Sequence, residues 1–268
     1  MSSSSPIGIF DSGVGGLTVA HAVSDLLPEE QLIYFGDSAH LPYGDKSAAT
    51  IQAYSIKICD ILLERGCKLI LIACNSASSA AYELIKAYVG SKTQVLSVID
   101  PVVDYVAKNY SNRKIGLIGT KQTIGSGVYD YQIKVKNSSI EVGSLATPLL
   151  VPMIEEGFHN DNISEAIISE YVKNAALENI EGLILGCTHY PLIKKEIKSH
   201  LDSSVEIIDS AQIVAKALKA YLEHQSLANY KRQDGNEFIV SDITPSFQKA
   251  ASLFFGSRIE LIQHKLWE

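Results

Sequence analysis

The chain has few of the features that mark secreted, membrane-spanning or metal-binding proteins. Its four cysteines form no CxxC pair, which argues against a zinc site or a redox dithiol. No apolar run approaches the ~18 residues of a membrane-spanning helix. The first residues lack the basic segment and apolar segment of a signal peptide. We therefore expect a cytoplasmic protein with reduced thiols, no metal and no membrane partner.

Positive charge is also scarce. There are 23 Lys and Arg against 30 Asp and Glu, a net charge of −7, and no basic run. Proteins that bind nucleic acids concentrate basic residues on one face, so nucleic acid is not expected as a partner. The 46% of hydrophobic and 20% of charged residues are typical of a globular protein. A length of 268 residues suggests about two domains.

What the sequence does contain is an alternation of short apolar runs with longer amphipathic stretches. The apolar runs predict buried strands at residues 7–10, 32–35, 69–73 and 95–99. The amphipathic stretches predict helices at residues 16–27, 47–65 and 77–89. Strand–helix–strand alternation is typical of a parallel sheet with helices on both faces.

The same pattern restarts in the second half of the chain. Residues 115–118 resemble 7–10, residues 182–187 resemble 69–74, and residues 205–209 resemble 95–100. Buried strands often look alike, but three matches in the same order at nearly constant separation favour an internal duplication. We therefore expect two facing α/β lobes with the functional site in the cleft between them.

The C-terminal tail has no counterpart after the first half. It predicts a helix, a strand at 237–240, a second helix and a last strand at 259–262. We expect this tail to complete the first lobe. The predicted domains are therefore 1–98 together with 211–268, and 99–210.

Cys74 follows a predicted buried strand and precedes an Ala- and Ser-rich helix. Ligands of open α/β sheets bind beyond the carboxyl ends of strands. Either Asn75 or Ser76 would be a good N-cap, and a helix N-terminus favours the thiolate of a nearby cysteine. Taken alone, Cys74 is as readily explained as a small buried packing residue.

Cys187 repeats this arrangement in the second half, with His189 two residues further on as a possible proton partner. Two thiols at matching strand ends, one in each half, would face each other across the cleft. A hydrolase needs one nucleophile and a base, whereas inversion of a stereocentre needs an acid or base on each face. The pair therefore favours racemisation. Cys59 and Cys67 lack this context and are interpreted as packing residues.

Other polar residues lie at predicted strand ends. Asp11 precedes a glycine-rich turn at 12–16, whose spacing is not that of a nucleotide-binding loop. We expect its glycines to let the backbone approach a small ligand. Residues 36–44 form a polar loop of the kind that often carries binding groups. Glu155 and Glu156 are most simply interpreted as a charged pair on a helix surface.

Taken together, the motifs resemble those of the cofactor-independent glutamate racemases. The matching segments are 10–18, 35–38 with 42–44, 73–75, 115–120 and 185–191, and the two cysteine motifs are the most specific. The resemblance implies two doubly wound α/β domains related by pseudo-twofold symmetry, often as a homodimer. It also implies interconversion of L- and D-glutamate without pyridoxal phosphate or metal, for peptidoglycan synthesis.

The resemblance also implies roles for individual residues. Cys74 matches the thiol that deprotonates the D isomer, and Cys187 the thiol that deprotonates the L isomer. Asp11 and His189 match assisting groups that also contact substrate, and Glu155 matches a further helper. The other implied substrate contacts are Ser12, Tyr43, Gly44, Asn75, Ser76, Thr120, Thr123 and Thr188.

The chain departs from the usual pattern at Ser76, where threonine is common. A serine keeps the hydroxyl but loses a methyl contact, which bears on affinity. Two alternatives stay open: a racemase of aspartate or another amino acid on the same fold, and a two-lobed ligand-binding protein that is not an enzyme.

Overall fold

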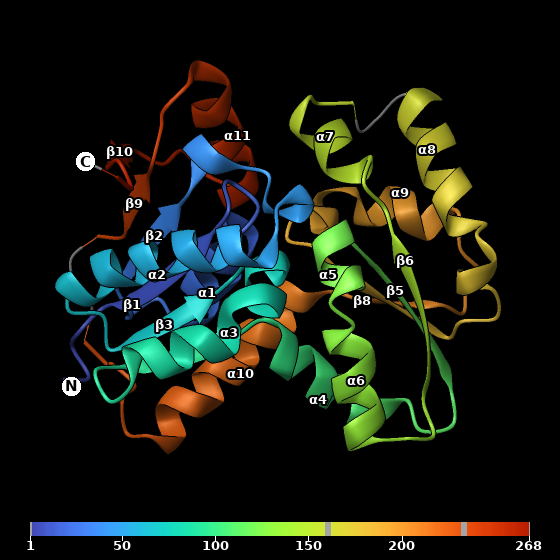
Figure 1. The fold of residues 1–268 in the computed structure, drawn as a ribbon, viewed down its shortest axis with the longest axis horizontal. Coiled ribbons are helices and arrows are strands. Elements are labelled where there is room, and N and C mark those ends of the chain that lie inside the picture. Colours follow the sequence, from blue (N-terminus) through green and yellow to red (C-terminus); the bar gives the residue numbers. More distant parts are fainter. Residues whose placement is uncertain (1, 159–161, 232–234, 268) are drawn as a thin grey trace.

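The computed structural model describes residues 2–158, 162–231 and 235–267. Within these residues, the strands form two parallel sheets, one in each of two lobes that lie side by side (Figure 1). The first sheet has the order β10-β9-β2-β1-β3-β4 and the second has the order β6-β5-β7-β8. The predicted α/β class with parallel sheets in two lobes is confirmed.

The first sheet combines strands from both ends of the chain. Its members are β1 (Ile7–Asp11), β2 (Leu32–Gly36), β3 (Leu69–Ile72), β4 (Gln94–Ser97), β9 (Glu237–Val240) and β10 (Leu261–Gln263). β9 pairs with β2 and carries β10 on its other side. The tail therefore extends the first sheet, and both termini lie on this lobe (Figure 1).

The second sheet repeats the central strand order of the first. Its members are β5 (Lys114–Gly119), β6 (Glu141–Ala146), β7 (Gly182–Gly186) and β8 (Glu206–Ile208). Matching β5, β6, β7 and β8 to β1, β2, β3 and β4 makes β6-β5-β7-β8 equivalent to β2-β1-β3-β4. The three sequence repeats thus fall on equivalent strands, which supports the duplication.

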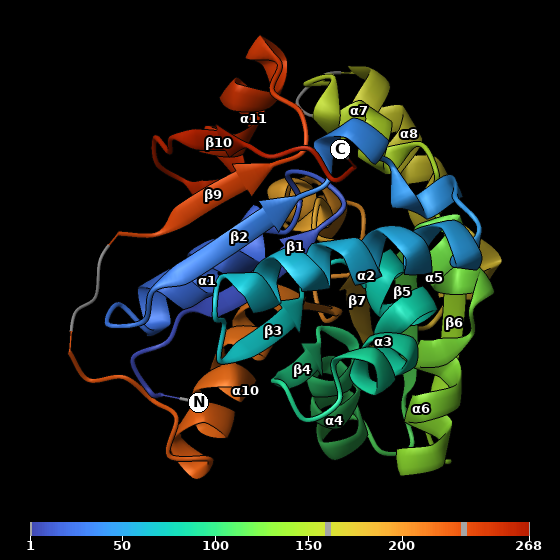
Figure 2. The same cartoon turned by 60° about the vertical axis from the view of Figure 1, so that its left-hand side comes forward.

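Helices cover both sheets (Figure 2). The helices of the first lobe are α1 (Leu17–Leu26), α2 (Ala48–Glu64), α3 (Asn75–Val89), α10 (Ser210–His224) and α11 (Pro245–Phe255). The second sheet is accompanied by α4 (Ile99–Asn109), α5 (Lys121–Gly125), α6 (Val128–Lys136), α7 (Leu150–Glu155), α8 (Asn162–Val172) and α9 (Lys194–Ser199). None of the helices in the described residues is both long and apolar enough to cross a membrane.

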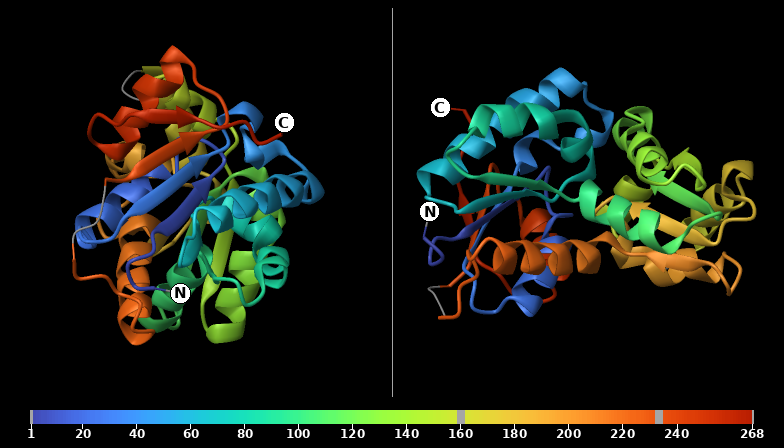
Figure 3. Two further views of the ribbon diagram at one scale, coloured as in Figure 1. Left: turned by 90° about the vertical axis from the view of Figure 1, so that its left-hand side faces the viewer. Right: turned by 90° about the horizontal axis from the view of Figure 1, so that it is seen from below.

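Strand alternation divides the apolar side chains of the first sheet between two cores. Ile7 and Ile9 belong to a large core. This core also contains buried side chains of α1, α4, α10 and the second lobe. Phe10 and Ile72 belong to a smaller core beneath α2 and α3. The two lobes therefore share one continuous core where α4 and α10 cross between them (Figure 3). The residue limits of the two predicted domains stay a prediction.

Most predicted boundaries of elements differ from the structure by one or two residues. The strand predicted at 95–99 ends at Ser97, because the Ser97 hydroxyl accepts hydrogen bonds from the backbone N–H groups of Ile99 and Asp100 and so starts α4. The strand predicted at 259–262 begins later, at Leu261.

A buried ion pair ties the tail to the rest of the first lobe. The Lys68 ammonium donates to Glu30 at 2.5 Å and to the backbone carbonyl of Leu227 at 2.8 Å. The side chains of Lys68 and Glu30 are 0% and 2% exposed. The other Glu30 oxygen accepts a hydrogen bond from the backbone N–H of Asn229.

Replacing Lys68 with methionine is expected to destabilise the protein strongly. The variant leaves the Glu30 carboxylate buried without its cation, a change that typically costs about 3–5 kcal/mol. Urea unfolding of the variant and of wild type measures the loss of free energy. The exposed pair Lys86–Glu83 provides the control, because Lys86→Met should change stability by less than about 1 kcal/mol. Equal losses in the two variants would contradict this interpretation.

Candidate active site

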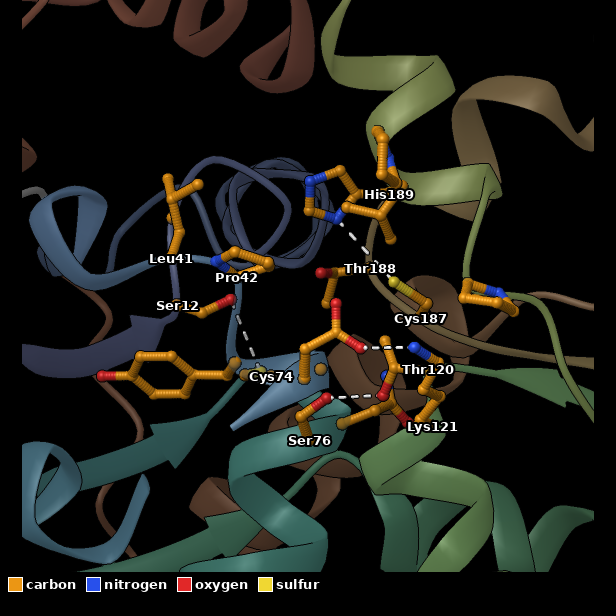
Figure 4. A pocket seen from close by; sticks show the side chains of 18 of the residues that line it. Ser12, Leu41, Pro42, Cys74, Ser76, Thr120, Lys121, Cys187, Thr188 and His189 are labelled. Carbon is orange, nitrogen blue, oxygen red and sulfur yellow. Dashed lines mark hydrogen bonds and ion pairs between the residues drawn. The ribbon is translucent and has the colours of Figure 1, made fainter. Parts of the chain in front are cut away.

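A pocket lies between the lobes, at the carboxyl ends of both sheets (Figure 4). Its volume is about 50 Å³. This is room for a few water molecules, since each needs about 10–15 Å³. The first lobe contributes segments that follow β1, β2 and β3, and the second lobe contributes segments that follow β5, β6 and β7. The predicted residues that line it are Ser12, Tyr43, Gly44, Cys74, Asn75, Ser76, Thr120, Glu155, Cys187, Thr188 and His189.

Cys74 and Cys187 approach this pocket from opposite sides (Figure 4). Cys74 lies two residues after the end of β3, and Cys187 directly follows the equivalent strand β7. Both side chains are almost fully buried, with 5% and 6% exposure. The structure thus brings together the two thiols that the sequence places at matching strand ends.

The surroundings of Cys74 favour a neutral thiol. Burial, and then the nearby Asp11 carboxylate, raise the pKa of the Cys74 thiol well above its ordinary value. The backbone N–H of Ala77 donates to Cys74 Sγ at 3.4 Å, which lowers the pKa by less. Cys74 itself is the N-cap of α3, so the prediction of Asn75 or Ser76 as the N-cap is wrong. Cys74 takes that role because α3 begins at Asn75 and the Cys74 sulfur accepts from the backbone N–H of Ala77.

Cys187 has a different partner. Its sulfur lies 3.7 Å from His189 Nδ1, and His189 Nε2 lies 2.9 Å from Glu155 Oε1. Burial lowers the pKa of His189, but its hydrogen bonds to Cys187 and Glu155 outweigh burial and raise the pKa to about 10. The His189 imidazole therefore links Cys187 to Glu155. The interpretation of Glu155 as a surface charge is therefore wrong, because α7 turns it toward His189.

Asp11 is fully buried behind the pocket wall, outside the residues that line it. Its Oδ1 accepts a hydrogen bond from the backbone N–H of Gly13 at 3.0 Å. Its Oδ2 accepts a longer one from the Thr188 hydroxyl at 3.4 Å. Asp11 therefore shapes the turn after β1 and acts on Cys74 through its charge.

The glycine-rich turn meets the other lobe at Gly15. A methyl group at Gly15 would lie 2.2 Å from Thr188 Oγ1 and 2.5 Å from His189 Nδ1. The Thr18 hydroxyl also donates to the backbone carbonyl of Thr188 at 3.1 Å. The expectation that this turn mainly approaches a ligand needs correction: Gly13 lines the pocket, whereas Gly15 allows the lobes to meet.

Replacing Gly15 with alanine is expected to lower kcat/KM at least about 100-fold. The added methyl group displaces His189, and misplacing a positioned acid–base group typically costs about 10²–10⁴-fold. Steady-state kinetics with both enantiomers of the substrate measure the effect. Gly125→Ala is the control, since a methyl group at Gly125 would contact nothing within 4 Å. Activity of Gly15→Ala within threefold of wild type would contradict the packing argument.

The loop that carries Tyr43 is held by a buried carboxylate. The Tyr43 hydroxyl donates to Asp37 Oδ2 at 2.6 Å, and the Ser241 hydroxyl donates to Asp37 Oδ1 at 2.7 Å. His40 Nδ1 lies 2.7 Å from the same Oδ1. Because Ser241 directly follows β9, the C-terminal tail positions a pocket loop.

Hydroxyl groups and a surface ion pair join the lobes at the pocket. Ser76 Oγ lies 2.8 Å from Thr120 Oγ1, which also caps α5 by accepting from the backbone N–H of Thr123. Asp45 and Lys121 pair at 3.1 Å across the same boundary. Thr123 is 1% exposed and does not line the pocket, so it supports Thr120 from behind.

The sequence does not predict several of the residues that line the pocket. Thr147, Val151 and Pro152 line the pocket from β6 and α7. Because β6 is not among the strands that the sequence predicts, Thr147 is not recognised as a polar residue at a strand end. The usable signal is the position of Thr147 directly after the apolar residues Leu145 and Ala146.

Comparisons with known proteins agree with this geometry. The family model of Asp/Glu/Hydantoin racemases matches residues 17–218. Glutamate racemase from Chlorobaculum parvum is 40% identical over 260 residues, covering 97% of this chain and 95% of that protein. Glutamate racemase from Neisseria meningitidis serogroup B is 39% identical over 259 residues, covering 96% and 95%.

Solved structures show the same fold. Glutamate racemase from Francisella tularensis, in complex with D-glutamate, has a TM-score of 0.93 and 38% identity and covers 99% of each chain. The Thermus thermophilus enzyme, in complex with beta-chloro-D-alanine, has a TM-score of 0.89 and 36% identity, also over 99% of each chain. The chain belongs to the Asp/Glu/Hydantoin racemase family.

Proposed function

We propose that this protein is a glutamate racemase that interconverts L- and D-glutamate with two thiols. The observation that carries the proposal is the approach of Cys74 and Cys187 to one pocket from opposite sides (Figure 4). Removal of the α-proton from one face and its replacement on the other needs an acid–base group on each face. The named activity of the relatives supports glutamate as the substrate.

In the direction from L to D, the Cys187 thiolate takes the α-proton of L-glutamate. The Cys74 thiol then donates its proton to the opposite face of the α-carbon. The enzyme is left with a thiol at Cys187 and a thiolate at Cys74. After product release, proton exchange with water restores the starting state, whereas the D to L reaction starts from the Cys74 thiolate. The assignment of Cys187 to the L isomer follows from the resemblance. The unequal surroundings of the thiols support Cys187 as the initial thiolate.

Residues around the thiols are proposed to assist these steps. His189, paired with Glu155, stabilises the Cys187 thiolate, and Asp11 acts on the proton of Cys74. We propose that hydroxyl and amide groups of the lining bind the two carboxylates and the amino group of the substrate. The reaction is proposed to need neither pyridoxal phosphate nor a metal, as in the enzymes that the motifs resemble.

Incubation of the dialysed, chelator-treated protein with L-glutamate in deuterium oxide tests the proposal. We expect optical rotation to decay to zero while deuterium appears at the α-carbon. Parallel reactions with L-aspartate test the main alternative, an aspartate racemase. Binding of glutamate without exchange would favour a non-enzymatic binding protein. Activity that appears only after addition of pyridoxal phosphate or a metal would overturn the two-thiol mechanism.

We further propose that the protein acts in the cytoplasm, as a homodimer, and supplies D-glutamate for peptidoglycan. The need for two reduced thiols supports a reducing compartment. The homodimer and the role in cell-wall synthesis rest on the resemblance. Light scattering of the purified protein tests the first. D-glutamate auxotrophy after deletion of the gene tests the second.

A further inference from the structure

Asn75 presents an unused donor in the pocket. It directly follows Cys74, is 3% exposed and lines the pocket. Among the described residues, its Nδ2 is a buried atom without a hydrogen-bond partner. A buried polar group without a partner carries a desolvation cost, so native structures rarely leave one unused. The amide N–H groups are therefore available to an acceptor on the ligand.

The other end of the same amide is held by the opposite lobe. Tyr129, on α6, donates its hydroxyl hydrogen to Asn75 Oδ1 at 2.8 Å. The ring is 1% exposed, and burial raises the pKa of Tyr129 well above its ordinary value, so the hydroxyl keeps the proton that it donates to Asn75. Figure 2 shows α3, which carries Asn75, in the first lobe and α6 in the second.

This hydrogen bond decides which end of the amide is free. An asparagine side chain has an acceptor oxygen at one end and two donor hydrogens at the other. A tyrosine hydroxyl that donates must face the oxygen, which leaves the NH₂ group for the ligand. If the amide rotated by 180°, the oxygen would replace the NH₂ group and would repel a carboxylate.

We propose that Tyr129 is a positioning residue that orients the Asn75 amide for binding a carboxylate of the substrate. The proposal deepens the proposed function and rests on it. Because Tyr129 and Asn75 come from different lobes, their hydrogen bond also makes the orientation of this donor depend on how the two lobes pack together. Tyr129 need not touch the substrate for this role.

Replacing Tyr129 with phenylalanine removes the hydroxyl and keeps the ring. We expect KM to rise about tenfold for both enantiomers while kcat changes less than about twofold, because the amide loses its fixed orientation before the reaction begins. Calorimetric titration with D-glutamate should show the same tenfold weakening. The matched control is Tyr110→Phe, which removes another buried hydroxyl, one that donates to Glu206. We expect this control to leave KM unchanged.

A double-mutant cycle separates positioning from packing between the lobes. If Tyr129 acts through Asn75, Tyr129→Phe should have no further effect on KM in an Asn75→Ala background. An equal tenfold effect in that background would overturn the proposal, as would a KM within twofold of wild type for Tyr129→Phe alone. The second criterion also applies if Asn75→Ala fails to fold. If wild type neither racemises nor binds glutamate, the proposed function is overturned as well.

Discussion

Replacing either Cys74 or Cys187 with serine is expected to abolish racemisation in both directions. Each face of the α-carbon needs its own acid–base group, and a serine hydroxyl is far too weak an acid to replace a thiol. Loss of one such group typically costs about 10²–10⁴-fold, which sets a lower limit on the effect. Circular dichroism with each enantiomer measures the rates. Cys59→Ala is the control, because Cys59 is buried in α2 outside the pocket lining.

Each of the same two variants should still catalyse elimination from one enantiomer of a substrate analogue. Elimination of a β-leaving group needs one base only, so Cys74→Ser should still eliminate from an L-configured analogue of glutamate. By the same reasoning, Cys187→Ser should eliminate from the D-configured analogue. Full racemase activity in either variant would contradict the two-base mechanism. Elimination by both variants from the same enantiomer would contradict the assignment of faces.

Replacing His189 with asparagine is expected to lower kcat from L to D by about 10²–10⁴-fold and to lower kcat from D to L by less. The variant removes the imidazole that lies 3.7 Å from the Cys187 sulfur and that is proposed to assist it. The enantiomers have equal free energies in water, so the ratio of the two kcat/KM values stays fixed near one. The asymmetry must therefore appear in kcat and KM separately. A loss of thermal stability with both kcat values unchanged would contradict the catalytic role.

The raised pKa of His189 gives this prediction a dependence on pH. The folded pKa of about 10 lies above the ordinary value of 6.5, so the imidazole stays protonated through neutral pH. Activity of wild type from L to D should therefore fall as the pH rises through about 10. The His189→Asn variant has no such proton, and it should lose this alkaline limb. Retention of the limb in the variant would assign it to another group.

Part of the site could be predicted from the sequence because the positions of these residues depend on local features. Cys74 and Cys187 each lie within two residues of the end of a buried strand, and the carboxyl ends of parallel strands meet at one edge of a sheet. The repeated strand pattern predicted two such edges. The roles that the resemblance implies for Asp11, His189 and Glu155 stay predictions, although the structure places them around the two thiols.

Other parts of the site depend on contacts between distant segments. Gly15 needs to be glycine because Thr188 and His189 approach it from the other lobe. Ser241 reaches the pocket loop through Asp37, although it lies 204 residues further along the chain than Asp37. Local pattern carries no information about such pairs, since each residue alone suits a turn or a loop equally well.

By itself, the sequence determined the α/β class, the two similar lobes and the two thiols, because apolar periodicity and strand ends are local properties. Only the tertiary structure decided that the thiols differ: Cys187 meets His189 and Glu155, whereas Cys74 meets Asp11. It also decided that Tyr129 holds the Asn75 amide. Charge and hydrogen bonding at these sites depend on distances of a few ångströms, which are set when the lobes pack together.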